Sequence, residues 1–303
     1  MKKFAFEIIG ARRLASGERP VPIGLELHQK LQEALKDRGW GIFWVSNFDK
    51  SAVGRALFPI RTAPAGLMQF IEKLHPLYLL AMPWGTALYY DEDDNALHYI
   101  ASTPEALEEV FFSDLPDDRR GELREQLNAA VAVLRDLGKD LVGPPPAERF
   151  RGYQFPASKQ PGRESYAEII FERALQAGES PKEAVEAVAG KMGDGLNHAF
   201  HWHVSGMAPV SDTARIVMTC HAAYARLAME MGTYHCPALP CTTVAYAEGD
   251  RVKAAMLKPL HMFKTFFRDV PWWTGIRYIR FPVVVRREIH ECLCHYLDCN
   301  PAS

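Results

Sequence analysis

Cysteine and histidine, the side chains that bind zinc, iron and copper, are concentrated in the last third of the chain. All six cysteines and eight of the eleven histidines lie at or beyond His198. The same side chains perform general acid-base and thiolate chemistry. This distribution predicts that a chemical site, if the protein has one, lies in the C-terminal part.

The first group of candidate ligands is a cluster of histidines. If this segment is helical, His198 and His201 share a face at a spacing of three and can bind one metal ion. If residues 200–204 are extended, His201 and His203 point to the same side. That arrangement is similar to the His-hydrophobic-His metal site of the HUH nucleases, and Tyr224 is the available catalytic tyrosine. The lysine or second tyrosine usual in that family is absent.

The second group lies near the C-terminus. On a helix, Cys292, His295 and Cys299 form one stripe. A fourth ligand can come from Cys220, Cys236, His235 or Cys241. A mixed imidazole and thiolate set suits zinc, which would activate a water molecule for hydrolysis or phosphoryl transfer. The same stripe also fits ordinary core packing, because free cysteine is often buried. The full predicted metal site comprises His198, His201, His203, Cys220, His221, Cys292, His295 and Cys299.

Two further cysteines flank a proline-rich loop. Cys236 or Cys241 beside His221 or His235 is a possible thiolate–imidazole nucleophile pair. No glycine-rich elbow accompanies them, so this alternative depends entirely on how the chain folds.

Charge is segregated along the chain although the net charge is only -2. Residues 91–140 are acidic, whereas residues 251–287 are basic and rich in aromatic side chains. Cations that neutralise phosphates and aromatics that stack on bases are typical of single-strand binding. The predicted nucleic-acid-binding residues are Arg277, Arg280, Arg286, Arg287, Trp272, Trp273 and Tyr278. Alternatively, the basic segment packs on the acidic one, or the acidic face docks a basic protein partner.

Composition limits the class of protein. Of the 303 residues, 48% are hydrophobic and 24% are charged, which is typical of a folded globular protein. No apolar run approaches the roughly 18 residues that a membrane helix needs. The N-terminus lacks the continuous apolar segment of a signal peptide. These features predict a cytoplasmic protein that does not enter a membrane and whose thiols are free or bound to metal.

The pattern of elements predicts an α+β fold. We expect an α+β domain over residues 1–142, a Pro/Gly-rich linker over 143–162, and a mainly helical domain over 163–303. A capping box at 180–183 starts one helix of the second part. Other predicted elements are a strand at 77–82 and helices at 212–231, 251–268 and 283–298.

Three functions are consistent with these patterns. The first is a cytosolic zinc enzyme, hydrolytic or acting on phosphodiesters. The second is a protein that binds or processes nucleic acid through residues 251–287. The third is a non-enzymatic inhibitor or immunity-type protein that uses its acidic 91–140 face.

Overall fold

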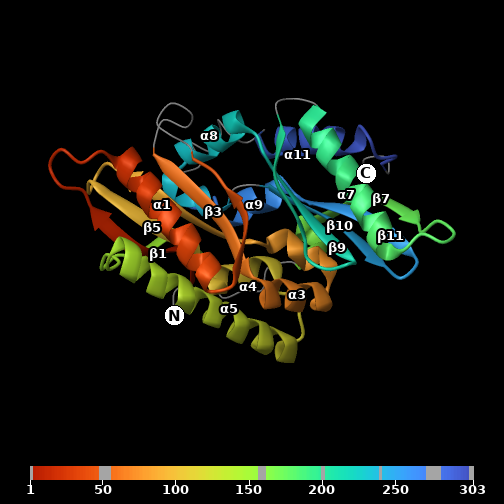
Figure 1. The fold of residues 1–303 in the computed structure, drawn as a ribbon, viewed down its shortest axis with the longest axis horizontal. Coiled ribbons are helices and arrows are strands. Elements are labelled where there is room, and N and C mark those ends of the chain that lie inside the picture. The colour runs from red at the N-terminus through yellow and green to blue at the C-terminus, as the bar shows by residue number, and fades with distance from the viewer. Residues whose placement is uncertain are drawn as a thin grey trace.

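The computed structural model describes residues 3–47, 56–155, 162–198, 202–238, 241–270 and 281–299. Helices are combined with two antiparallel sheets, so the predicted α+β class is confirmed (Figure 1). The first sheet has the strand order β2-β3-β4-β5-β1-β6, and the second has the order β7-β11-β10-β9-β8. Among the described helices, none is both long and apolar enough to cross a membrane.

The first sheet and its helices come from the N-terminal part. Its strands are β1 (Lys3–Arg13), β2 (Trp40–Val45), β3 (Leu57–Pro64), β4 (Trp84–Asp91), β5 (Ala96–Ser102) and β6 (Phe150–Phe155). Its helical segments are α1 (Pro20–Asp37), α3 (Ala65–Leu74), η1 (Pro76–Ala81), α4 (Pro104–Phe111), α5 (Asp117–Leu137) and η2 (Gly138–Val142).

The second sheet and its helices come from the C-terminal part. Its strands are β7 (Ala167–Ala174), β8 (His203–Pro209), β9 (Ala214–Cys220), β10 (Cys241–Glu248) and β11 (Arg251–Leu257). Its helical segments are α6 (Arg163–Tyr166), α7 (Pro181–His198), α8 (Ala222–Glu230), η3 (Thr233–Ala238), α9 (Pro259–Thr265) and α11 (Phe281–Cys294).

The two parts are copies of one motif. From β1 to α4 (residues 3–111, the first repeat) and from β7 to α9 (residues 167–265, the second repeat), the elements follow the same order. Their sheets pair equivalent strands, because β2-β3-β4-β5-β1 matches β8-β9-β10-β11-β7. From β3 to β4, equivalent residues are 157 positions apart, as with Trp84 and Cys241 at the starts of β4 and β10. The fold is therefore a tandem duplication.

Individual hydrogen bonds recur at equivalent positions. Thr86 Oγ1 donates to the Ile60 carbonyl at 3.2 Å, and Thr243 Oγ1 donates to the Val217 carbonyl at 2.7 Å. The turn before the first helix also recurs. Gly17 and Gly178 both have positive φ, 86° and 82°, a conformation that favours glycine.

Charged contacts repeat in the same way. Arg12 pairs with Glu18 in the first repeat, and Arg173 pairs with Glu179 in the second. These shared contacts fix the same turn and helix entry twice.

The repeats share a core and interlock. One face of the second sheet packs under α7 and α11 through Val217 and Ala245, while Ile216 and Val244, one residue before each along its strand, join the core of the first repeat. Alternation along each strand accounts for this two-sided burial. Segment η1 packs on β10, and its equivalent η3 packs on β4. In Figure 1, α9 lies near the centre, between the two sheets.

Several predicted elements are corrected. Residues 212–231 form β9 followed by α8, residues 251–268 begin as β11, and residues 77–82 lie largely in η1 rather than in a strand. Apolar runs such as Arg215–Cys220 fit either a buried strand or a helix, and periodicity alone does not separate them. The expected linker also contains β6, which pairs with β1. The capping box is confirmed, since Ser180 and Glu183 bond reciprocally.

Candidate functional site

The predicted metal ligands are dispersed rather than gathered. His198 stacks on His295 with ring centroids 4.4 Å apart at the exposed ends of α7 and α11. Cys220 and His221 lie at the end of β9, and Cys292 is buried in the core under α7. Within the described ranges, no three Cys, His, Asp or Glu side chains could hold a metal ion. His201 and the side chain of His203 lie outside the described residues, so zinc binding stays a prediction.

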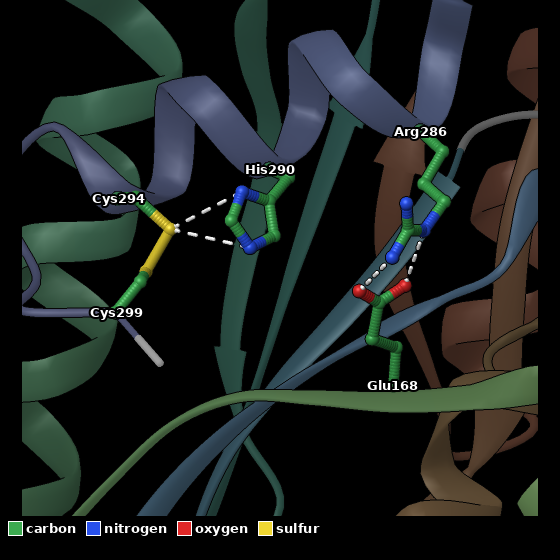
Figure 2. The surroundings of a disulfide bond; sticks show 5 residues. All are labelled: Glu168, Arg286, His290, Cys294 and Cys299. Atoms are coloured by element: carbon green, nitrogen blue, oxygen red, sulfur yellow. Dashed lines mark hydrogen bonds and ion pairs between the residues drawn. A yellow bond between two sulfur atoms is a disulfide. The ribbon is translucent and has the colours of Figure 1, made fainter. Parts of the chain in front are cut away.

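Cys299 forms a disulfide with Cys294, at the end of α11 (Figure 2). The expectation that the thiols are free or metal-bound is therefore wrong for these two cysteines. They are five residues apart, so the chain can turn back at the end of α11 and bring their sulfurs together. Figure 2 also shows His290, one turn before Cys294, with its Nδ1 at 3.6 Å from the Cys294 sulfur. The remaining cysteines, Cys220, Cys236, Cys241 and Cys292, are not part of a disulfide.

The basic segment is paired within its own half of the chain. Arg286 makes a bidentate ion pair with Glu168, with its shorter distance 2.6 Å (Figure 2), and Arg287 lies 3.9 Å from Glu291. The described ion pairs of residues 251–287 thus do not reach the acidic 91–140 segment. The remaining predicted nucleic-acid-binding residues, Trp272, Trp273, Arg277, Tyr278 and Arg280, lie outside the described residues.

A cavity lies in the second repeat, and we call it the apolar pocket. Its wall is almost wholly apolar and comes from the ends of β9, β10 and β11 and from α8, α9 and α11. Its aromatic members are Trp202, Tyr224, Phe263, Phe267 and Phe281. A recess with an apolar, aromatic wall and few polar groups is typical of a small-molecule site.

The pocket exists because the second repeat has smaller side chains than the first. Trp84 is fully buried at the start of β4, whereas its equivalent at the start of β10 is Cys241. The buried side chains of Met68 and Ile71 in α3 correspond to two alanines of α8. Those alanines, Ala225 and Ala228, line the pocket. Interiors are otherwise close-packed, so three large-to-small differences at one place leave open space.

A small polar group borders the aromatic wall. Tyr224 Oη donates to Glu288 Oε1 at 2.6 Å, and Trp202 Nε1 donates to Glu288 Oε2 at 3.2 Å. The ring of His221 lies 4.4 Å from that of Tyr224. Burial and then the hydrogen bond to Glu288 raise the pKa of Tyr224. This phenol therefore stays protonated at neutral pH and holds α8 against α11.

The pocket thiols are not activated as nucleophiles. Burial raises the pKa of Cys220 to about 12, and it raises the pKa of Cys241 to about 11. Burial also raises the pKa of Cys236 well above its usual range. Since the thiolate is the reactive form, burial of these thiols disfavours the predicted thiolate–imidazole pair. The side chains of Cys220 and Cys241 form part of the apolar wall of the pocket.

Comparison with known proteins leaves the function open. No family model matches the chain, and no curated protein matches it. Among solved structures, it is similar to the crystal structure of the uncharacterized conserved protein DUF302 from Bacillus stearothermophilus. That similarity has a TM-score of 0.33 and 14% identity, and it covers 42% of this chain and 97% of the other.

The sequence itself carries a signal for the duplication. Glu7-Ile8-Ile9 recurs as Glu168-Ile169-Ile170, and a Leu-x-x-Gly-Glu-x-Pro pattern begins at both Leu14 and Leu175. These two patterns pair residues that are 161 positions apart. The pairing of Trp84 with Cys241 needs the shorter spacing of 157, which the strand positions show. The residues that line the apolar pocket come from separate helices and strands, and only the folded structure shows that they meet.

Proposed function

We propose that this protein binds a small, largely apolar molecule in the apolar pocket of the second repeat. The observation that carries the proposal is the difference between the repeats: one copy has the buried Trp84 at the start of β4, and the other has Cys241, which lines the apolar pocket, at the start of β10. The neutral thiols and the aromatic wall favour binding by burial of apolar surface. A cytoplasmic location, expected from the sequence, stays a prediction.

The proposal is tested with N-phenyl-1-naphthylamine, an uncharged dye whose fluorescence rises in apolar sites. We expect saturable binding to the full chain and competition by other apolar aromatic compounds. Cys241→Trp restores the side chain of the first repeat and should weaken dye binding at least about tenfold, which corresponds to about 1.4 kcal/mol. Dye binding to this variant at the strength of the parent protein would reject the proposal.

The matched control is Cys241→Ala, which changes the same position but keeps the space open. It should bind the dye within about twofold of the parent protein. Both variants are first compared by circular dichroism and thermal unfolding, so that loss of binding is read only from folded protein. If neither the parent nor the control binds any apolar probe, a small-molecule function for this pocket is excluded.

A further inference from the structure

A second, smaller cavity lies between the two repeats, and we call it the central cavity. Most of its wall consists of equivalent residues from the two repeats. The equivalent pairs are Leu80 and Pro237, Ala81 and Ala238, Ser102 and Leu257, Leu107 and Met262, and Phe111 and Phe266. The cavity therefore lies where the two copies of the motif face each other.

One charged residue breaks this symmetry. Arg61 of β3 lines the central cavity and is only 7% exposed, whereas its equivalent in β9 is Met218. Its Nη1 donates to the Pro83 carbonyl at 2.7 Å. Burial lowers the pKa of the guanidinium to about 10, so the group remains a cation at neutral pH. A buried cation is costly, and it gives the cavity a positive end.

The central cavity adjoins the apolar pocket. Ala238, Leu257 and Met262 line both spaces, so a single layer of side chains separates them. Met262 has a flexible thioether chain, and such side chains repack readily around a ligand. Cys241, in the wall of the apolar pocket, interacts electrostatically with Arg61. The cationic end therefore lies close enough for one ligand to reach it from the apolar pocket.

We propose that the ligand is an apolar monocarboxylic acid, with its carboxylate on Arg61 and its apolar body in the apolar pocket. This inference rests on the proposed function and names its ligand class. A guanidinium is the preferred partner of a carboxylate, because its planar fork donates two parallel hydrogen bonds. The layer formed by Ala238, Leu257 and Met262 parts to connect the two spaces, mainly through a change of the Met262 rotamer.

The test compares two competitors of the dye that differ only at one end, 4-phenylbutyrate and 4-phenyl-1-butanol. At pH 7 the acid should displace N-phenyl-1-naphthylamine from the full chain at a concentration at least about tenfold lower, as expected for a charge-assisted hydrogen bond. Equal displacement by acid and alcohol overturns the carboxylate assignment but leaves the proposed function intact. Absence of dye binding defeats the proposed function itself, so the two failures are distinguishable.

Arg61→Met places the residue of the second repeat in the first and removes the cation. The preference for the acid should disappear, while the dye and the alcohol bind as they do to the parent protein. A folded variant that keeps the preference overturns the assignment. If Arg61→Met does not fold, Arg61→Lys retains the charge and should keep part of the preference. The comparison of acid and alcohol on the parent protein decides the question without either variant.

Discussion

Trp84 and Cys241 occupy equivalent positions at the starts of β4 and β10, and they give the two repeats opposite interiors. Trp84 is completely buried, and its indole Nε1 donates to the Ser102 carbonyl at 2.9 Å. Cys241 leaves its repeat open toward the aromatic wall of α8, α9 and α11. One copy of the motif is thus a filled scaffold, and the other carries a cavity.

This relationship predicts that the tryptophan is structural. Trp84→Cys should lower the free energy of unfolding by about 3–5 kcal/mol, because it removes a large buried side chain and leaves a cavity. Urea unfolding measures the change. The matched exchange, Cys241→Trp, should cost far less, because it fills existing space. A small cost for Trp84→Cys would contradict the view that the two positions differ in packing.

Larger side chains introduced from α8 should weaken dye binding, as Cys241→Trp in β10 does. Ala225→Met and Ala228→Ile introduce the side chains of α3 into α8 and should each weaken dye binding several-fold. Ala223, on the same helix, is exposed, so Ala223→Met is the control and should leave binding unchanged. The measurement is a dye titration. Parallel losses in the control would show that the helix, rather than the pocket volume, is responsible.

The ion pair that docks α11 predicts a difference between two adjacent arginines. Arg286 contacts Glu168, whose side chain is 13% exposed, whereas Arg287 is 66% exposed. Arg286→Ala should lower the free energy of unfolding by about 1–3 kcal/mol, because it leaves a largely buried carboxylate unpaired. Arg287→Ala should change it by less than about 0.5 kcal/mol. Equal effects in chemical denaturation would contradict this account.

His261 should make stability fall in mild acid. Burial lowers its pKa to about 4 from the usual 6.5, and it packs between Phe111 and Tyr166, while Lys258 and Lys264 lower the pKa slightly further. Because the unfolded chain binds this proton more readily, the contribution is fully present above about pH 6.5. It is lost progressively as pH falls toward 4, by up to about 3 kcal/mol.

The measurement is the free energy of unfolding between pH 7 and pH 4.5 for the parent protein and for His261→Asn. The variant lacks the titrating ring, so its stability should fall less over this range. Carboxylates titrate in both proteins, and their effect cancels in the difference. Identical pH profiles would show that His261 is not buried in its neutral form.

We expect the Cys294–Cys299 disulfide to stabilise the folded protein modestly. It closes a short loop, with a sequence separation of five, and the chain-entropy relation gives about 2 kcal/mol for such a loop. Cys299→Ser should lower the free energy of unfolding by about this amount, and a reductant should have the same effect on the parent protein. A further effect of reductant on Cys299→Ser would indicate that another thiol is involved.

Local sequence determined much of this protein. The capping box of α7 and the acidic hairpin tip between β4 and β5 each satisfy or restrict nearby backbone groups. Short-range chemistry of this kind is readable without a fold. The α+β class and the ends of several helices were therefore predictable. The strand β9 was not, because a short apolar run has no distinctive period.

Only the tertiary structure decided where the candidate site lies. The concentration of cysteine and histidine reflected separate places in the fold: the α7–α11 ends, the apolar pocket and the buried core. The pocket depends on the small side chains of Cys241, Ala225 and Ala228. Small residues leave a cavity only where the surrounding side chains do not fill the space, and the sequence alone does not show those surroundings. Arg61 is likewise one ordinary strand arginine in the sequence. Its role as the positive end of a cavity arises because the second repeat packs over it and removes it from water.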